Sequence, residues 1–481
     1  MLKLYNTLTR RKEDFTPVKT GEAKIYSCGP TVYSFQHIGN MRAAIFQDIT
    51  RRTLKFLGYK VTSVQNITDV GHLVSDEDEG EDKMLKAAVK ENKNPFEIAK
   101  FYTDAYTDDL HLLNVEFPTF MPKATEEIPE QIEIIKNLLK KEIAYKTQDG
   151  IYFDVAKFPK YGQLSGRTLE QIQENTQERI EENTDKHNPQ DFALWKFTTG
   201  TNAHHIMKWD AEFGEGFPGW HIECSAMSAK YLGKEFDIHT GGIEHVPIHH
   251  ENEIAQNTCS GCVTKVGYWI HNAHLQVDGE KMAKSSGTAY LLKDLIKKGY
   301  SPIALRELIL RTHYRKSLNF TFESLDTATN NIKKINEFNN KLDTLKTIEN
   351  KSNNKIENLS KVHTDTFTQS IEDDFNTPKA FASLYDFMSE FNKQKEYTKQ
   401  DIESAKQFIQ KTDEILGLLI KEKVQVIPQQ IIDLANLRKD AKENKDWAKC
   451  DELRNQIQEL GYSIKDDKNS KEGFIISIIN K

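Results

Sequence analysis

The sequence of 481 residues has a formal net charge of −7 and is 38% hydrophobic and 28% charged, which supports several buried cores in a polar protein of roughly three or four domains. No apolar run approaches the ~20 residues of a membrane helix, residues 1–15 lack the apolar core of a signal peptide, and five scattered cysteines exclude a disulfide framework, so we expect a cytoplasmic protein. The acidic balance excludes a surface that is basic throughout, so any nucleic acid must be bound through local basic patches.

The first predicted unit is a strand, a helix and a second strand. Residues 23–28 form a short apolar segment that ends before a Gly-Pro pair, which cannot continue a buried strand. From Ile38 onward, apolar residues recur at helical spacing, and Gly58 stands where a helix C-cap is expected. Residues 60–67 are the predicted second strand. A βαβ unit of this kind predicts a parallel sheet and a Rossmann-like core.

The rest of the chain divides by composition. After the first unit, a stretch to about residue 200 has helical character broken by prolines, and Gly- and His-rich segments then return to the core. Long Lys-, Asn- and Glu-rich stretches with helical spacing follow, and the chain closes with a helix pair and a short apolar strand. The predicted fold class is an α/β Rossmann-like catalytic domain with a parallel sheet, followed by helical C-terminal domains. The predicted divisions are 1–115, 116–205, 206–260, 261–325, 326–424 and 425–481.

The first cluster with potential chemistry lies between the first strand and the following helix, from Gly29 to Asn40. A helix N-terminus offers free N–H groups and a positive dipole to phosphate. There His37 can reach a phosphate, and Gly39 lets a nucleotide approach the backbone. An ordinary strand-to-helix turn is the alternative, because the pattern is neither a P-loop nor a dinucleotide fingerprint.

The second cluster is the segment KMAKSSG at residues 281–287. Its two lysines, Lys281 and Lys284, stand three apart and precede small residues. That composition suits a mobile loop that neutralises phosphates. From the segment alone, a solvated basic turn remains the alternative.

The third cluster is rich in metal ligands. It comprises Cys28, Cys224 and the segment HHENE at residues 249–253. His249 and Glu253 are four apart, so on a helix they share one face. Two thiolates, one imidazole and one carboxylate would form a tetrahedral zinc site. A zinc hydrolase is the generic alternative, and four protein ligands would leave it no position for water.

Two further patterns are weaker metal candidates. The segment beginning His250-Glu251 lacks the second histidine of the H-E-x-x-H motif. Cys259 and Cys262 form one CxxC pair, but no second pair exists to complete a zinc ribbon. For this pair, two ordinary thiols in a turn are the alternative.

In chain order, these clusters resemble the motifs of class I aminoacyl-tRNA synthetases: a HIGH-like turn, a later KMSKS-like loop and a helical C-terminal region. Within that class, the surrounding sequence is similar to the cysteinyl-tRNA synthetases. The resemblance runs from Leu2 to the end of the chain. The segments that carry it are YSCGPTVYSFQHIGNMR, NITDVGHL, PGWHIECSAMS, FDIHTGGIEHVPIHHENEIAQ and KMAKS.

Two positions and one short segment depart from the common pattern of that family. Asn40 stands where a second histidine is common, and Ala283 stands in place of a serine. Residues 243–248, around His245, differ from the commonest bacterial form. Asparagine can still donate a hydrogen bond, and Ala283 leaves both lysines in place, so we expect altered rates but not lost activity. His245 is either an extra polar group near the pocket or a surface histidine.

The resemblance implies one zinc ion per chain, held by Cys28, Cys224, His249 and Glu253. Bound directly to the thiolate of L-cysteine, the ion would exploit the softness and lower pKa of sulfur. Serine is nearly isosteric with cysteine, and a hydrophobic pocket alone rejects such a substrate poorly. The residues implied to line the cysteine pocket are Thr31, Thr68, Trp220 and His239.

The resemblance also implies that ATP binds with Mg²⁺. The cysteine carboxylate would attack the α-phosphate, in a step that depends on positioning and on stabilising the developing charge. His37, Asn40, Lys281 and Lys284 would provide that stabilisation. The implied ATP-binding residues are Gly29, His37, Gly39, Asn40, Lys281 and Lys284.

For tRNA(Cys), the resemblance implies a stem contact in residues 261–325, a helical bundle in 326–424 and an anticodon module in 425–481. Trp447 offers a stacking face for an unpaired base, although packing in the core of the module is the alternative. Lys442 and Asp451 are the other implied anticodon contacts, and we expect a monomer that binds no membrane.

Two alternative functions compete with that of a cysteinyl-tRNA synthetase. A ligase that joins cysteine to a small amino-sugar would keep the zinc and ATP clusters. Such a small acceptor would not require the helical region or the module that contains Trp447. A non-catalytic RNA-binding relative would be expected to lose the paired lysines or the zinc ligands, and all of them are present.

Overall fold

The computed structural model describes residues 1–71, 83–168, 171, 185–282, 287–349, 355–420, 429–444, 446–460, 462–466 and 474–478. The chain forms two compact units, Met1–Leu419 and Ile420–Lys481. Within the described ranges, no helix has both the length and the apolar character that crossing a bilayer requires.

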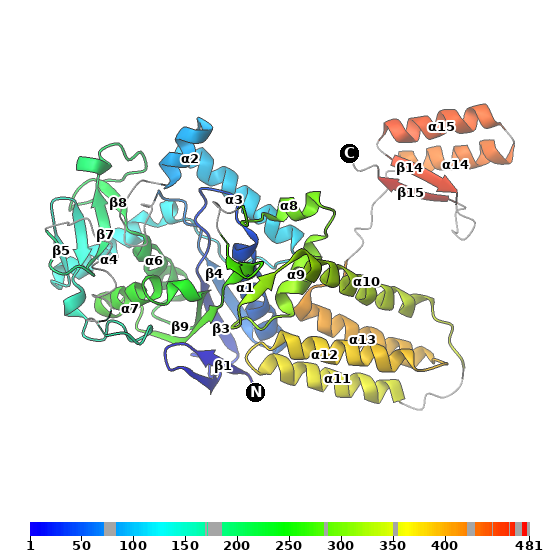
Figure 1. Cartoon of the computed structure of the whole chain (residues 1–481), viewed down its shortest axis with the longest axis horizontal. Helices are drawn as coiled ribbons and strands as arrows, with labels where there is room; N and C mark the ends of the chain where they lie inside the picture. The colour runs from blue at the N-terminus through cyan, green and yellow to red at the C-terminus, as the bar shows by residue number, and fades with distance from the viewer. Residues whose placement is uncertain are drawn as a thin grey trace. The chain divides into compact units, whose positions relative to one another are not determined.

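The core of the first unit is a sheet of four parallel strands in the order β10-β9-β3-β4 (Figure 1). Helix α1 (Ile38–Phe56) joins β3 to β4, and α7 (His249–Ser260) joins β9 to β10. Because the strand order reverses between β3 and β9, a crevice is expected at their carboxyl ends. This sheet confirms the predicted βαβ unit and the predicted fold class. The strands are β3 (Glu22–Ser27), β4 (Lys60–Gln65), β9 (Glu235–Gly242) and β10 (Lys265–Asn272).

Both ends of α1 follow from local sequence. At the N-terminus, the Asn40 backbone N–H donates to Nδ1 of His37 at 3.3 Å, and the His37 backbone N–H donates to Oδ1 of Asn40 at 3.1 Å. This reciprocal capping box satisfies two of the helix's first N–H groups. At the other end, Leu57 is the C-cap and Gly58 follows at φ +89°, a conformation that favours glycine.

The prediction of largely helical structure up to about residue 200 is wrong from Ala144 onward. After α2 (Lys83–Glu91), α3 (Pro95–Leu112) and α4 (Ile128–Lys140), four short strands form an antiparallel sheet. Residues such as Trp195 and Phe153 are fully buried in it. Short apolar runs buried in this way cannot be told from helix by periodicity. The strands are β5 (Ala144–Lys146), β6 (Gly150–Phe153), β7 (Phe192–Phe197) and β8 (Gly216–Pro218).

The remaining elements of the first unit are small sheets and a helical bundle. A hairpin of β1 (Lys3–Asn6) and β2 (Arg11–Asp14) opens the chain, and α6 (Trp220–Leu232) precedes β9. Figure 1 shows the bundle helices lying side by side, and α11 packs against both α12 and α13. The later elements are β11 (Leu275–Val277), β12 (Glu280–Lys281), α8 (Leu292–Lys297), α9 (Pro302–Leu310), β13 (Leu318–Phe320), α10 (Phe322–Thr344), α11 (Lys355–Glu372), α12 (Thr377–Asn392) and α13 (Lys399–Leu416).

The second unit has the predicted helix pair, α14 (Gln429–Glu443) and α15 (Trp447–Glu459). Where one terminal strand was predicted, the structure has an antiparallel hairpin of β14 (Tyr462–Asp466) and β15 (Phe474–Ile478). The strand β14 was not predicted, because its sequence YSIKD is mostly polar. Buried residues from both helices and from β15 form the small core: Ile431, Ala435, Ile457 and Phe474.

Candidate active site

An open cavity of about 340 Å³ lies at the carboxyl ends of the central strands. Its walls include residues that were not predicted from the sequence, among them Gln47, Gln65 and Asn272. Lys284 lies outside the described residues, and only the backbone of Lys281 is described. The predicted site residues that line the cavity are Cys28, Gly29, Thr31, His37, Gly39, Asn40 and Trp220.

Gly29 is required by the close approach of two strand ends. A Cβ added there would lie 1.6 Å from the carbonyl oxygen of Asn66, which follows β4. The Gly29 backbone N–H donates to Oδ1 of Asn66 at 2.8 Å. Asn66 therefore joins the ends of β3 and β4 beside the cavity. This role of Asn66 was not predicted, although the residue stands in the segment NITDVGHL.

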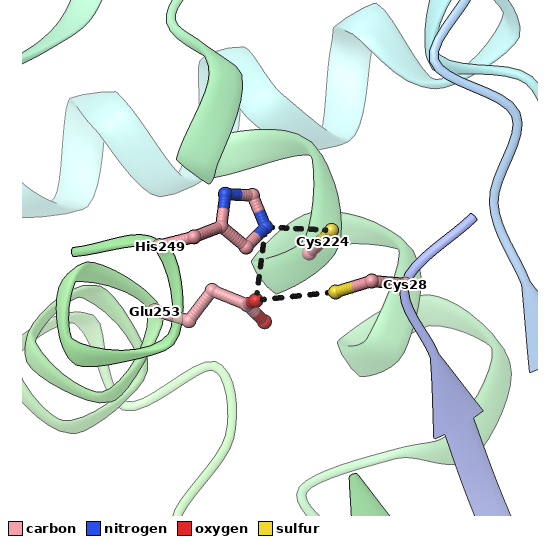
Figure 2. A group of neighbouring side chains, drawn as sticks. All are labelled: Cys28, Cys224, His249 and Glu253. Carbon is pink, nitrogen blue, oxygen red and sulfur yellow. Dashed lines mark hydrogen bonds and ion pairs between the residues drawn. The ribbon is translucent and has the colours of Figure 1, made fainter. Parts of the chain in front are cut away.

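The four predicted zinc ligands converge in the structure (Figure 2). Nε2 of His249 lies 3.4 Å from Sγ of Cys224 and 3.2 Å from Oε1 of Glu253. Sγ of Cys28 lies 3.9 Å from the same carboxylate oxygen. Tetrahedral zinc with its usual bond lengths of about 2.0–2.3 Å needs ligand atoms about 3.3–3.8 Å apart. The geometry and the donor set therefore fit one zinc ion.

The electrostatics of the cluster also suit a cation. Burial disfavours ionisation of the Cys224 thiol, but hydrogen bonds with Cys28 and His249 outweigh it and lower its pKa. Burial likewise opposes the charge of Glu253, but His239 and His249 bring its pKa down to about 2. The Glu253 carboxylate and the Cys224 thiol, whose ionisation these contacts favour, thus belong to the same cluster. That charge distribution is what a divalent cation would balance.

A layer of histidines surrounds the four ligands. Nδ1 of His221 lies 2.9 Å from Nδ1 of His249, and Nε2 of His239 lies 2.8 Å from Oε2 of Glu253. Nε2 of His250 approaches Sγ of Cys28 at 3.1 Å, and its Nδ1 contacts His271 at 2.7 Å. Contacts of this kind orient metal ligands. The roles of His221 on α6 and His271 on β10 were not predicted from the sequence.

Two predicted pocket residues lie behind the cavity wall. His239 is fully buried on β9 and stacks on Trp269 with ring centroids 4.3 Å apart. The Thr68 hydroxyl is also buried and donates to Oε2 of Glu223 at 2.8 Å. Neither residue is among those that line the cavity, so their role in the cysteine pocket stays a prediction.

Cys259 and Cys262 lie at the end of α7 and just beyond it, and both side chains are partly buried. Among the described residues, neither takes part in a group of converging metal ligands. Sγ of Cys262 instead lies 3.3 Å from Oδ1 of Asn257. This arrangement favours two ordinary thiols.

The second unit presents the predicted anticodon residues on its helices. Trp447 begins α15 and is 59% exposed, so it is not part of the core of this unit. Lys442 forms an ion pair with Asp466 at 2.6 Å, and Asp451 forms one with Arg454 at 3.5 Å.

Comparisons with known proteins agree with this architecture. The family model described as "tRNA synthetases class I (C) catalytic domain" matches residues 14–330, and the DALR domain model matches residues 366–421. The cysteine–tRNA ligase of Treponema denticola is 41% identical over 97% of this chain and 98% of its own length. That of Thermus thermophilus is 40% identical over the same shares of both chains.

Solved structures share the fold at low identity. A leucyl-tRNA synthetase of Agrobacterium radiobacter aligns with a TM-score of 0.61 at 10% identity, covering 84% of this chain and 85% of its own. A methionyl-tRNA synthetase of Mycobacterium tuberculosis aligns with a TM-score of 0.57 at 12% identity, covering 83% and 90%. With the near full-length matches above, the chain belongs to the cysteine–tRNA ligase family of class I aminoacyl-tRNA synthetases.

Proposed function

We propose that this chain activates L-cysteine with ATP to form cysteinyl-adenylate and transfers the cysteinyl group to the 3′ end of tRNA(Cys). One observation carries the proposal: two half-sites meet in one cavity. The N-terminus of α1, with His37 and Asn40, forms one half. Cys28, at the edge of the converging thiol, imidazole and carboxylate groups, belongs to the other.

The second half-site would hold the resident metal. When bound, zinc would supply a soft partner for the substrate thiolate, which the hydroxyl of serine cannot match. The side chains around the cluster would fix the ligand geometry; His239, for example, holds the Glu253 carboxylate from the side away from His249. The ligands would be Cys28, Cys224, His249 and Glu253.

In the first step, a carboxylate oxygen of cysteine attacks the α-phosphorus of ATP. A C–O–P linkage forms, the bond to the β-phosphate breaks, and pyrophosphate leaves with its accompanying Mg²⁺. The capping box fixes His37 and Asn40 at the positive end of α1. There they would hold the phosphates from one side, and Lys281 and Lys284 would neutralise them from the other.

In the second step, a terminal ribose hydroxyl of the tRNA attacks the acyl carbon of the adenylate, and AMP leaves. The helical region, which matches the DALR domain model, and the second unit would bind the tRNA. The exposure of Trp447 supports base stacking there in preference to core packing.

The test measures both half-reactions with the purified, zinc-loaded protein. Pyrophosphate exchange into ATP should depend on cysteine, with serine and alanine as controls that give little exchange. Cysteine should then be attached to purified tRNA(Cys). Exchange without any charging of tRNA would contradict the proposal and favour a ligase with a small acceptor. Equal exchange with serine would contradict selection through sulfur.

A further inference from the structure

His245 lines the cavity but has no part in the proposed zinc or ATP sites. It ends the short helical turn η4 (Ile243–His245), which follows β9 at the crevice. Its ring centroid lies 6.0 Å from that of Trp220 and 5.3 Å from that of the proposed zinc ligand His249. His245 therefore stands where the amino-acid half of the cavity meets the proposed metal site.

The backbone fixes which nitrogen of this ring carries the proton. The Gly242 backbone N–H donates to Nδ1 of His245 at 3.2 Å. A backbone N–H can only donate, so Nδ1 is the acceptor and the hydrogen of the ring is on Nε2. Gly241 leaves room for this arrangement, because a Cβ there would lie 2.9 Å from Nδ1 of His245. Within the described ranges, Nε2 has no protein partner.

Of the polar groups of bound cysteine, the carboxylate is the one that can accept a hydrogen bond from Nε2–H of His245. An N–H donor cannot serve the ammonium group of the substrate, which itself only donates. In the proposed function, the sulfur is bound at the zinc ligands. The carboxylate oxygens remain, and a hydrogen bond to a carboxylate is stronger than one to a neutral acceptor.

We propose that Nε2–H of His245 donates to the α-carboxylate of L-cysteine and so positions it towards the phosphates at the N-terminus of α1. One carboxylate oxygen would accept this hydrogen bond while the other attacks the α-phosphorus. The inference rests on the proposed function and adds a substrate contact that recognises the carboxylate of the amino acid.

The test compares L-cysteine with cysteamine, which has the thiol and the amine but no carboxylate. Dissociation constants would be measured by calorimetry on the zinc-loaded full chain, for the wild type and for His245→Leu. The variant should bind cysteine about tenfold to a hundredfold more weakly, as expected when a hydrogen bond to a charged group is lost. Its affinity for cysteamine should change less than about twofold, which is within ordinary mutational scatter. The KM for cysteine should rise while the KM for ATP stays constant.

Two further variants separate a specific contact from general packing. His245→Gln keeps an N–H donor and should recover part of the cysteine affinity. Ile243→Ala lies on the same turn, is 40% exposed and does not line the cavity, so it should leave both affinities unchanged. Equal weakening of cysteine and cysteamine in His245→Leu, or no change in either, would overturn the inference and leave the proposed function standing. If the wild-type protein bound neither ligand, the proposed function itself would fail, and this inference with it.

Discussion

Cys224 and Cys259 are two cysteines with different surroundings. Sγ of Cys224 lies 3.4 Å from Nε2 of His249, whereas the described surroundings of Cys259 contain no group of converging ligands. We therefore expect Cys224→Ala to lose zinc, because the substitution removes one of the four proposed ligands and the binding free energy of the ion comes from those ligands. Cys259→Ala should retain one zinc per chain. Metal analysis of the purified variants measures both, and loss of metal from the Cys259 variant alone would contradict the ligand assignment.

A substitution at Lys284 tests the phosphate-binding half of the proposed site. Removing one positive donor from developing phosphate charge typically costs about 3 kcal/mol, or roughly a hundredfold in rate. Lys284→Ala should therefore slow cysteine-dependent pyrophosphate exchange by about that factor. Zinc content should not change, which separates this effect from damage to the metal site. Near-normal exchange in the variant would remove Lys284 from the mechanism.

At the scale of elements, α9 carries a carboxyl group in the interior of the helical region. Glu307 is fully buried, and its Oε1 accepts from Nδ2 of Asn331 on α10 at 2.9 Å and from the hydroxyl of Tyr385 on α12 at 3.3 Å. Burial raises the pKa of Glu307 to about 7. The packing of α9, α10 and α12 therefore includes a group that titrates near neutral pH.

This raised pKa predicts a pH-dependent stability. In the unfolded chain the carboxyl ionises near its ordinary value of 4.5, so between about pH 5 and 7 the folded state binds the extra proton. Stability must then fall as pH rises, by up to about 1.4 kcal/mol per pH unit. Glu307→Gln should remove this loss. The Tm of the variant relative to wild type should rise by roughly 2–3 °C between pH 5 and pH 8, and a constant difference would refute the assignment.

The sequence predicted elements where local signals are strong. The strand at 23–28 and the helix from Ile38 correspond to β3 and α1, because a Gly-Pro stop, regular apolar spacing and Gly58 mark their ends. The strands from β5 to β7 were not predicted, because their short apolar runs carry no period. Local signals also cannot reveal pairs distant in the chain, such as Asp48 with Arg306 at 2.6 Å.

The candidate site, too, could be predicted from local sequence only in part. The shared face of His249 and Glu253 follows from helical spacing alone. Their meeting with Cys28 and Cys224 was predicted through family resemblance, because it depends on how α6, α7 and β3 pack. The contact between His221 and His249 depends on the packing of α6 against α7, and nothing in the spacing of the sequence indicates it.

At the scale of the whole molecule, the proposed function assigns activation and tRNA binding to separate parts of the chain. The cavity is built from residues 28–282, whereas the second unit begins at Ile420 and has its own core. Deleting residues from Pro428 onward should therefore leave cysteine-dependent pyrophosphate exchange unchanged but sharply weaken tRNA charging. Both activities are measured on the same preparation. Fully normal charging by the truncated protein would show that the second unit does not bind tRNA.

A substitution at Trp447 tests with a single side chain whether the second unit binds tRNA. Trp447 is 59% exposed at the start of α15, so Trp447→Ala removes little core packing and should leave the fold of the unit intact. If an anticodon base stacks on the ring, the variant should raise the KM for tRNA(Cys) by a factor that corresponds to about 1–3 kcal/mol. In this variant, a tRNA with an altered anticodon should have the same KM as unaltered tRNA(Cys), because two changes that disrupt one contact do not add.

Lys449→Ala is a matched control on the same helix, since Lys449 is exposed and paired with Glu452 at 2.9 Å. If the anticodon change weakens charging equally in the wild type and in Trp447→Ala, the ring does not contact the anticodon, and the second unit binds tRNA through another surface.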